Sequence, residues 1–341
     1  MCPARPASHR SPGLRALALP VALLCVATLT SAPRSQDLVT HPYQGITYID
    51  RAATVPRAVR MHVVQIDVAT PGIRFKLSPA AGPREVIRQT TLEFLRAEHA
   101  QVAINAHFFW PFPSPEMESS VLGIGASEGT VYSSFEIPEQ SYALLPNAPG
   151  VNIDAMNHAT IVHRDGSQPD GRHAREPVML FNTLAGSAQI VTDGVVTIPK
   201  YADAEHPDGL TPGGPNGYSN ERSWYDAVNA RTAIGISRDG RTMAWFTVDA
   251  RGGSAGLSVR ELAEVLVRDY AVWNALNLDG GGSTSMAMED PVTHAAALVN
   301  VSSDNPAGRA VGSSLAVFAT ANAGGTPEPA GASRFPFALV R

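Results

Sequence analysis

An acidic residue followed by glycines and hydroxyl side chains is the most informative feature of the sequence. Consecutive glycines lose backbone entropy on folding and offer no packing, so they favour a place where the backbone approaches a ligand closely. Their N–H groups can form an anion-binding nest with hydroxyl groups beside it, which would suit a phosphate or a sugar hydroxyl. The alternative is an ordinary flexible loop that the acidic residue caps. The run consists of Asp279, Gly280, Gly281, Gly282, Ser283 and Thr284.

Polar residues also stand at the ends of other apolar stretches, where sites are often built. Asn105 follows one such stretch, Arg231 begins another, and Asp249 follows a third. Asp249 and Asp279 together supply the two carboxylates needed for acid, base or nucleophile chemistry at an anomeric carbon. Taken singly, each aspartate is more commonly a turn or cap residue.

Arginines offer a second kind of chemistry. Arg231 and Arg309 could each bind a phosphate through the planar fork of the guanidinium group. A single arginine is more often a surface or ion-pair residue, so this interpretation depends on the two arginines meeting the glycine run in space.

Two helices and two hairpins must position these residues. Thr90 with Glu93 forms a capping box that predicts a helix to about residue 99, and Ser258 with Glu261 predicts a second helix. Both helices lead into buried strands, at 101–104 and 275–278. The Asp-Gly pairs at 193–194 and 239–240 separate β-rich stretches and predict antiparallel hairpins.

The remaining segments define the organisation of the chain. Residues 1–36 have the arginines, the short apolar run and the small residues of a secretory signal, and that run is too short to span a bilayer. Residues 37–58 are Pro-punctuated and are interpreted as a segment leading into a strand at 59–68. Residues 199–224 are rich in Gly, Pro, Asp and Asn and predict a long loop, either a lid or a mobile insertion. Residues 321–341 predict a Gly/Pro/Ala-rich tail.

Charge and cysteine content exclude several functions. The 26 Lys+Arg against 31 Asp+Glu residues give a formal net charge of -5, which argues against nucleic-acid binding. Removal of residues 1–36 takes away four arginines and no acids, so the charge becomes 22 minus 31, or -9. Cys2 and Cys25 leave with the signal, so the exported protein has neither a disulfide nor a thiol nucleophile. We expect a periplasmic or secreted protein with no transmembrane segment after signal removal.

The motifs, taken in order, resemble the phosphodiester glycosidase family, including its exported bacterial members. The resemblance covers roughly residues 59–320 and rests mainly on the glycine-rich segment. The other matching segments are Asn105-Ala106-His107-Phe108-Phe109, Arg231-Thr232-Ala233-Ile234-Gly235, Val248-Asp249-Ala250-Arg251, Gly256-Leu257-Ser258, Val299-Asn300, Ser303-Asp304 and Arg309-Ala310-Val311. Ala106 and Ala250 stand where the family usually has glycine, so a positive φ at either position would produce strain or shift the loop.

The resemblance implies a fold, a reaction and further site residues. The fold would be a single mixed α+β domain with antiparallel hairpins, buried strands and a few capped helices, its motif loops gathered at one cleft. The reaction would be hydrolysis of a sugar-1-phosphodiester, a carbohydrate substrate of the cell envelope or outside the cell. Substrate and phosphate binding would fall to the glycine run and to Ser283, Thr284, Arg309, Asn300, Asp304 and His107. His107 and the loop at 110–112 could form a sugar-stacking wall, although a packed aromatic loop is the commoner role for residues 110–112.

Several alternatives stay open at this point. A phosphodiesterase would cut the P–O bond of the same substrate, and a non-catalytic protein would bind surface polysaccharide without turnover. The histidine spacing disfavours a zinc hydrolase. The sequence neither requires nor forbids Ca²⁺ or Mg²⁺ held by aspartates with phosphate oxygens.

Overall fold

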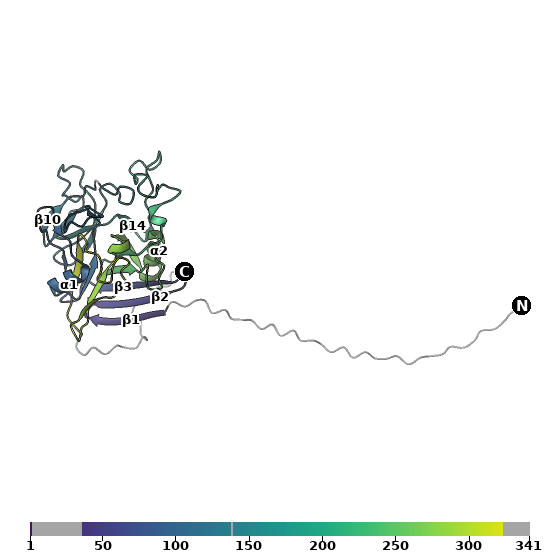
Figure 1. Cartoon of the computed structure of the whole chain (residues 1–341), viewed down its shortest axis with the longest axis horizontal. Coiled ribbons are helices and arrows are strands. Elements are labelled where there is room, and N and C mark those ends of the chain that lie inside the picture. The colour runs from purple at the N-terminus through teal and green to yellow at the C-terminus, as the bar shows by residue number, and fades with distance from the viewer. Residues whose placement is uncertain (2–35, 138, 323–341) are drawn as a thin grey trace. The chain divides into compact units, whose positions relative to one another are not determined.

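In the computed structural model, which describes residues 1, 36–137 and 139–322, an eight-stranded antiparallel sheet forms the largest layer (Figure 1). The predicted Asp-Gly hairpins are confirmed: one joins β16 (Arg231–Ser237) to β17 (Thr242–Val248), and the other joins β14 (Ala188–Thr192) to β15 (Val195–Val196). In spatial order the strands are β1 (Gln36–Tyr43), β2 (Ile46–Ala53), β3 (Val59–Asp67), β17 (Thr242–Val248), β16 (Arg231–Ser237), β18 (Val272–Asn277), β14 (Ala188–Thr192) and β15 (Val195–Val196).

Three smaller sheets complete the strand framework. The first, in order, is β20 (Ala296–Leu298), β19 (Met286–Glu289), β6 (Val102–Asn105), β21 (Ser314–Phe318) and β4 (Arg74–Leu77). The second is β10 (Thr130–Ser133), β9 (Gly125–Ser127), β13 (Asn182–Ala185), β11 (Gly150–Ile153) and β12 (Ala159–Val162). The third is β5 (Val86–Ile87), β8 (Glu118–Val121) and β7 (Phe109–Trp110).

Both predicted helices are confirmed with their capping boxes. Helix α1 (Thr91–Glu98) begins after Thr90 and ends at His99 in the left-handed conformation. Helix α2 (Val259–Tyr270) begins after Ser258. With two α-helices and 21 strands among the described residues, the fold is richer in β-structure than the mixed α+β domain that we expected.

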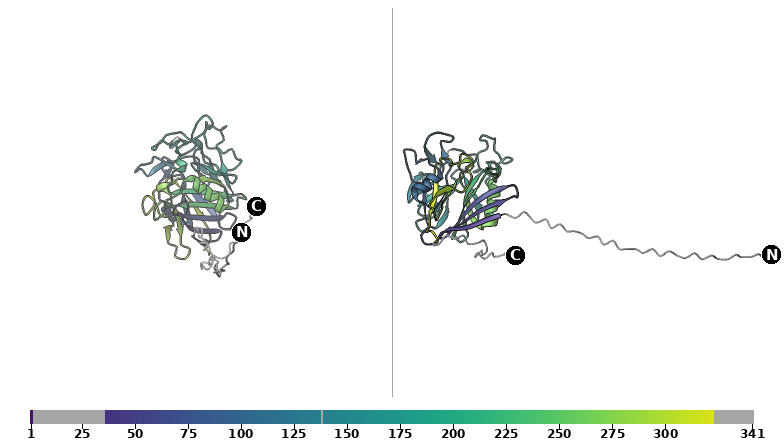
Figure 2. Two further views of the ribbon diagram at one scale, coloured as in Figure 1. Left: turned by 90° about the vertical axis from the view of Figure 1, so that its right-hand side faces the viewer. Right: turned by 60° about the horizontal axis from the view of Figure 1, so that its bottom comes forward.

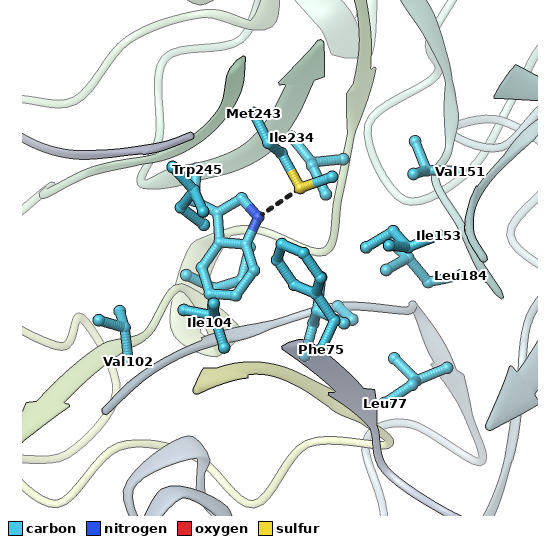
Figure 3. Close-up of a cluster of buried hydrophobic side chains, with 14 of the residues drawn as sticks. Phe75, Leu77, Val102, Ile104, Val151, Ile153, Leu184, Ile234, Met243 and Trp245 are labelled. Carbon is cyan, nitrogen blue, oxygen red and sulfur yellow. Dashed lines mark hydrogen bonds between the residues drawn. The ribbon is translucent and has the colours of Figure 1, made fainter. Parts of the chain in front are cut away.

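Hydrophobic packing holds the layers together on both faces of the large sheet. On one face Trp245 and Ile234 pack against Ile104 of β6 and Phe75 of β4 (Figure 3). On the other face, Phe246 and its neighbours pack against α2. Burial of several such side chains, each contributing roughly 1.5–3 kcal/mol, fixes the strand ends that carry the site.

Residues 37–58 differ from the expected leading segment. They contain β1 and β2, which lie beside β3 at one edge of the large sheet (Figure 2). Gly45, at φ +73, provides the tight turn between the two strands. The signal at 1–36 lies outside the described residues apart from its two ends, and the tail at 321–341 is described only for Ala321 and Asn322.

The long loop at 199–224 is anchored to the large sheet. Tyr201 and Leu210 are buried in the core between this sheet and α2. The Tyr201 hydroxyl donates to the Tyr142 carbonyl oxygen and accepts from the Trp224 N–H. No helix in the described parts of the chain combines the length and hydrophobicity needed to cross a bilayer.

Candidate active site

Three neighbouring strands bring polar residues to one end of the large sheet. Arg231 begins β16 and pairs with Val248, the last residue of β17, which Asp249 follows. On the other side of β16, Leu278 donates its N–H to Thr232, so Asp279 leaves the sheet beside Arg231. Because side chains alternate along a strand, Asp249 and Arg231 project from opposite faces.

Asp279 is the titratable group best suited to chemistry here. It keeps partial access to solvent although protein surrounds it densely. Burial raises the pKa of its carboxyl group to about 7, while a Ser283 hydrogen bond, the charge of Arg309 and the Gly280 N–H act in the opposite direction. Its backbone is fixed, since its N–H donates to the Ala106 carbonyl oxygen at 3.1 Å.

Asn105 is a clamp that joins three segments. Its Nδ2 donates to the Asp279 carbonyl oxygen at 2.6 Å. Its Oδ1 accepts from the Thr232 hydroxyl at 2.8 Å and from the Ser285 N–H at 2.9 Å. The sequence made Asn105 a candidate site residue at a strand end, but its side chain is fully buried and sets the course of the glycine-rich loop.

Several backbone N–H groups of the glycine-rich loop are bonded within the protein, which limits the predicted anion nest. Residues Gly281–Ser283 make a single 3-10 turn, with Gly281 at φ +59. The N–H groups of Gly281, Ser283 and Thr284 donate to protein carbonyl oxygens at 2.8, 3.2 and 3.2 Å. These donors are therefore not available to a ligand in this conformation.

The glycines instead make room for Arg309. A Cβ atom at Gly282 would lie 2.1 Å from Nη2 of Arg309. The Arg309 guanidinium donates to Ser283 Oγ at 3.3 Å and to Asp304 Oδ2 at 2.9 Å, and it stacks 4.6 Å from the centre of the Phe112 ring. These contacts place a cation directly beside Asp279 and Ser283.

Arg231 is buried, and no carboxylate among the described residues forms an ion pair with it. Its side chain is 2% exposed and donates to the carbonyl oxygens of Leu257, Trp224 and Ala227. Desolvation lowers the pKa of the guanidinium to about 10, so it stays charged at neutral pH. A buried cation that only carbonyl groups neutralise is electrostatically suited to an anionic ligand.

Asp249 is committed to structural contacts. Its Oδ2 lies 3.3 Å from His62 Nε2, and its Oδ1 accepts from the Val301 N–H at 3.0 Å. The residue is fully buried, and both carboxylate oxygens have protein partners. The two-carboxylate arrangement expected for Asp249 with Asp279 therefore has only one carboxyl group in a position to meet a substrate.

Asn300 and Thr284 hold the far end of the loop. Asn300 Oδ1 accepts from the Met286 N–H at 2.8 Å, and its Nδ2 donates to the Thr284 carbonyl oxygen at 3.2 Å. Asn300 is 6% exposed and acts as a second clamp. The Thr284 and Ser285 hydroxyls are buried next to it and have no hydrogen-bond partner in the described structure.

His107 does not lie on a sugar-stacking wall. It is fully buried, with Nδ1 2.7 Å from Ser313 Oγ and Nε2 2.9 Å from both the Ile124 carbonyl oxygen and the Ala185 nitrogen. Desolvation lowers its pKa to about 4, so the ring is neutral at physiological pH. Trp110, in the neighbouring loop, is 40% exposed.

Two further points of the sequence analysis concern a bound Ca²⁺ or Mg²⁺ and backbone strain at Ala106 and Ala250. The described residues contain no group of three or more His, Cys, Asp and Glu side chains placed to hold a metal ion. Neither Ala106 nor Ala250 adopts a positive φ, so alanine causes no backbone strain at either position.

His62 and Tyr48 are site-supporting residues that sequence reasoning missed. The Tyr48 hydroxyl lies 2.8 Å from His62 Nδ1, so both ring nitrogens of His62 are occupied. The sequence signal for this pair was His62 itself, a histidine inside the apolar strand expected at 59–68. A polar side chain at such a position needs a buried partner.

Comparisons with known proteins give relatives of the chain and solved structures with a similar fold. A bovine N-acetylglucosamine-1-phosphodiester alpha-N-acetylglucosaminidase is 30% identical over 132 residues, covering 37% of this chain and 24% of the bovine protein. The chain thus spans about a quarter of the curated relatives that it matches. The catalytic domain of the zebrafish protein of that name has a TM-score of 0.55 at 18% identity, covering 85% of both chains.

A second solved structure has the same fold. A Burkholderia pseudomallei protein described as exported gives a TM-score of 0.50 at 18% identity, covering 76% of this chain and 74% of its own. Residues 98–318 match the phosphodiester glycosidase family, which is more than half of the 341 residues. That range includes every residue of the glycine-rich loop, both clamps and both arginines. The chain therefore belongs to the phosphodiester glycosidase family.

Proposed function

We propose that the protein hydrolyses a sugar-1-phosphodiester to the free sugar and a phosphomonoester. The observation that carries this proposal is the Asp279 carboxyl group, with a pKa of about 7, beside Ser283 and Arg309. A base works best when its pKa lies near the operating pH. The family of the chain supports the same reaction class.

The reaction breaks the bond between the anomeric carbon and the phosphate oxygen. The electron pair stays on that oxygen, and the departing phosphate is a good leaving group that needs no strong acid. A water molecule bonds to the anomeric carbon and gives a proton to the ionised Asp279, which then releases the proton to solvent. Asp279 also stabilises the positive charge that develops on the sugar.

The two arginines act on the phosphate. Arg309 uses two of its five N–H groups for Asp304 and Ser283, so further donors are left for phosphate oxygens. Arg231 contributes a positive charge that no carboxylate in the described part of the chain neutralises. Preorganised cations of this kind stabilise the charge that moves onto the leaving group.

We further propose that the protein acts after export, in the periplasm or outside the cell, on a glycan or glycoconjugate. The signal-like residues 1–36 support export, as does the likeness to an exported protein. No catalytic step above requires a metal ion, and any Ca²⁺ or Mg²⁺ would need ligands from the substrate phosphate.

Phosphorus NMR in water enriched in oxygen-18 tests the reaction. The purified protein is incubated with a panel of sugar-1-phosphodiesters beside Asp279→Asn, with Asp170→Asn, an exposed aspartate, as the matched control. Glycosidic cleavage would be supported by oxygen-18 in the sugar product, together with loss of activity in Asp279→Asn but not in Asp170→Asn. Label on the phosphate would indicate P–O cleavage, and saturable binding without product would indicate a binding protein.

A further inference from the structure

A pocket of about 690 Å³ adjoins the candidate active site and has no role in the reaction above. Asn300 and Asp304, which line the pocket, also belong to the active site. Its other walls come from α1, β20, the turn after β17 and the loop at 301–306. The pocket is thus built from segments that the fold already holds beside the glycine-rich loop.

The charge of the pocket is positive. Arg96 and Arg251 line it, and neither forms an ion pair with a described carboxylate. Arg96 donates to the Ala296 carbonyl oxygen at 2.8 Å, and no described residue contacts the Arg251 side chain by a hydrogen bond. The acidic residue of the lining, Asp304, is neutralised by Arg309.

Several arginines elsewhere in the described structure form ion pairs, such as Arg57 with Glu261 at 2.7 Å and Arg60 with Asp50 at 2.6 Å, whereas Arg96 and Arg251 do not. Two unpaired arginines in one concave surface therefore create a local field that attracts anions. Apolar side chains of Leu92, Leu298 and Val301 complete the wall and could cover the carbon face of a sugar or linker.

The pocket is connected to the reacting centre by consecutive contacts. Asp304 contacts Arg309, Arg309 contacts Ser283, and Ser283 hydrogen bonds to Asp279. Asp304 therefore belongs both to the wall of the pocket and to the series of contacts that leads to Asp279. We infer that this pocket binds a second anionic group of the substrate, a phosphate or carboxylate, through Arg96 and Arg251.

This inference rests on the proposed function and narrows its substrate class. A sugar-1-phosphodiester with a neutral aglycone would leave both arginines without a partner. An anionic glycan, in which phosphate or carboxylate groups recur along the chain, would occupy the active site and the pocket together. Binding should weaken at high salt, because exposed charges are screened.

The experiment uses non-cleavable analogues, so that binding is measured without turnover. In these ligands a methylene group replaces the glycosidic oxygen, and the aglycone ends in an amide, a carboxylate or a methyl phosphodiester, with several linker lengths. Calorimetric titration gives Kd for the wild type and for Arg96→Gln/Arg251→Gln. Arg238→Gln is the matched control, since this unpaired arginine lies after the opposite end of β16, stacked on Trp273.

We expect the wild type to bind a charged ligand more tightly than the amide, and the double variant to lose about 10-fold in affinity for the charged ligand alone. Comparison of Kd between the ligands that end in a carboxylate and those that end in a methyl phosphodiester identifies which anion the pocket prefers. Equal Kd values for charged and neutral ligands in the wild type would overturn the inference, and so would an equal loss in Arg238→Gln. Failure of the proposed function would appear separately, as absence of cleavage of the natural-linkage substrates.

Discussion

Nε2 of His62 lies 3.3 Å from Oδ2 of Asp249, and the other carboxylate oxygen accepts from the Val301 N–H. The pair connects the large sheet to the loop that carries Asn300 and Asp304. Asp249 therefore holds this loop beside the candidate active site, and both of its carboxylate oxygens have protein partners.

Replacement of Asp249 by Asn should loosen this connection. We expect a loss of about 1–3 kcal/mol in unfolding free energy, because the buried His62 ring loses its carboxylate partner. Turnover should fall, but the midpoint of the pH profile should stay near 7, since Asp279 is unchanged. A shifted midpoint in this variant would show that Asp249 itself titrates in the reaction.

The pH dependence of turnover should follow Asp279. Its pKa is raised to about 7, and the proposed base is the ionised form. The value of kcat/KM should therefore rise about tenfold per pH unit below 7 and reach a plateau above it. Rate measurements from pH 5 to 9 check this, and a profile that falls with rising pH would instead assign Asp279 as an acid.

Gly282→Ala tests the contact between the loop and Arg309. The new methyl group would lie 2.1 Å from Nη2 of Arg309, so the guanidinium must move. We expect turnover to fall by about 10²-fold, as for the loss of one transition-state donor. Stability should change little, because the displaced atom is the end of a flexible side chain.

Gly166→Ala is the matched control, since a Cβ atom there meets nothing within 4 Å. It should leave both turnover and melting temperature unchanged. In an Arg309→Ala background, Gly282→Ala should cause little further loss, because the two residues act through one contact. Additive losses would contradict this explanation.

His107 should make the fold sensitive to acid. Burial lowers its pKa from 6.5 to about 4, so the unfolded chain binds the proton first as the pH falls. Unfolding free energy should therefore decrease between pH 6.5 and 4, by up to roughly 3 kcal/mol. Denaturation of His107→Gln should show a shallower pH dependence over that range, whereas His158→Gln, at an exposed position, should match the wild type.

Local signals in the sequence predicted the local structure. The capping boxes at Thr90 and Ser258 each fix backbone hydrogen bonds within four residues, so the helix starts are readable directly. The Asp-Gly pair before Val195 specifies a hairpin for the same reason. The β1–β2 hairpin was missed because Pro42 and Pro56 obscured the alternating pattern on either side of Gly45.

Contacts between distant residues could not be predicted in this way. The anion nest was a reasonable interpretation of three glycines, but Gly281 donates to Ala230, fifty-one positions earlier. His107 was assigned to a binding wall from its motif, and only the packing of Ser313 and Ile124 around it shows that it is buried. A sequence motif identifies candidate site residues, and the tertiary contacts decide which of these residues a substrate can reach.

The half-buried carboxyl group of Asp279 has a consequence for the evolution of the fold. Its folded pKa lies above the ordinary value of 3.8, so the native state holds a proton that the unfolded chain releases between about pH 4 and 7. The favourable contribution of the protonated form is complete below pH 4 and is lost as the pH rises through 7. At neutral pH and above, the fold would gain stability from a neutral residue at this position, which places Asp279 among the sites where selection for activity opposes selection for stability.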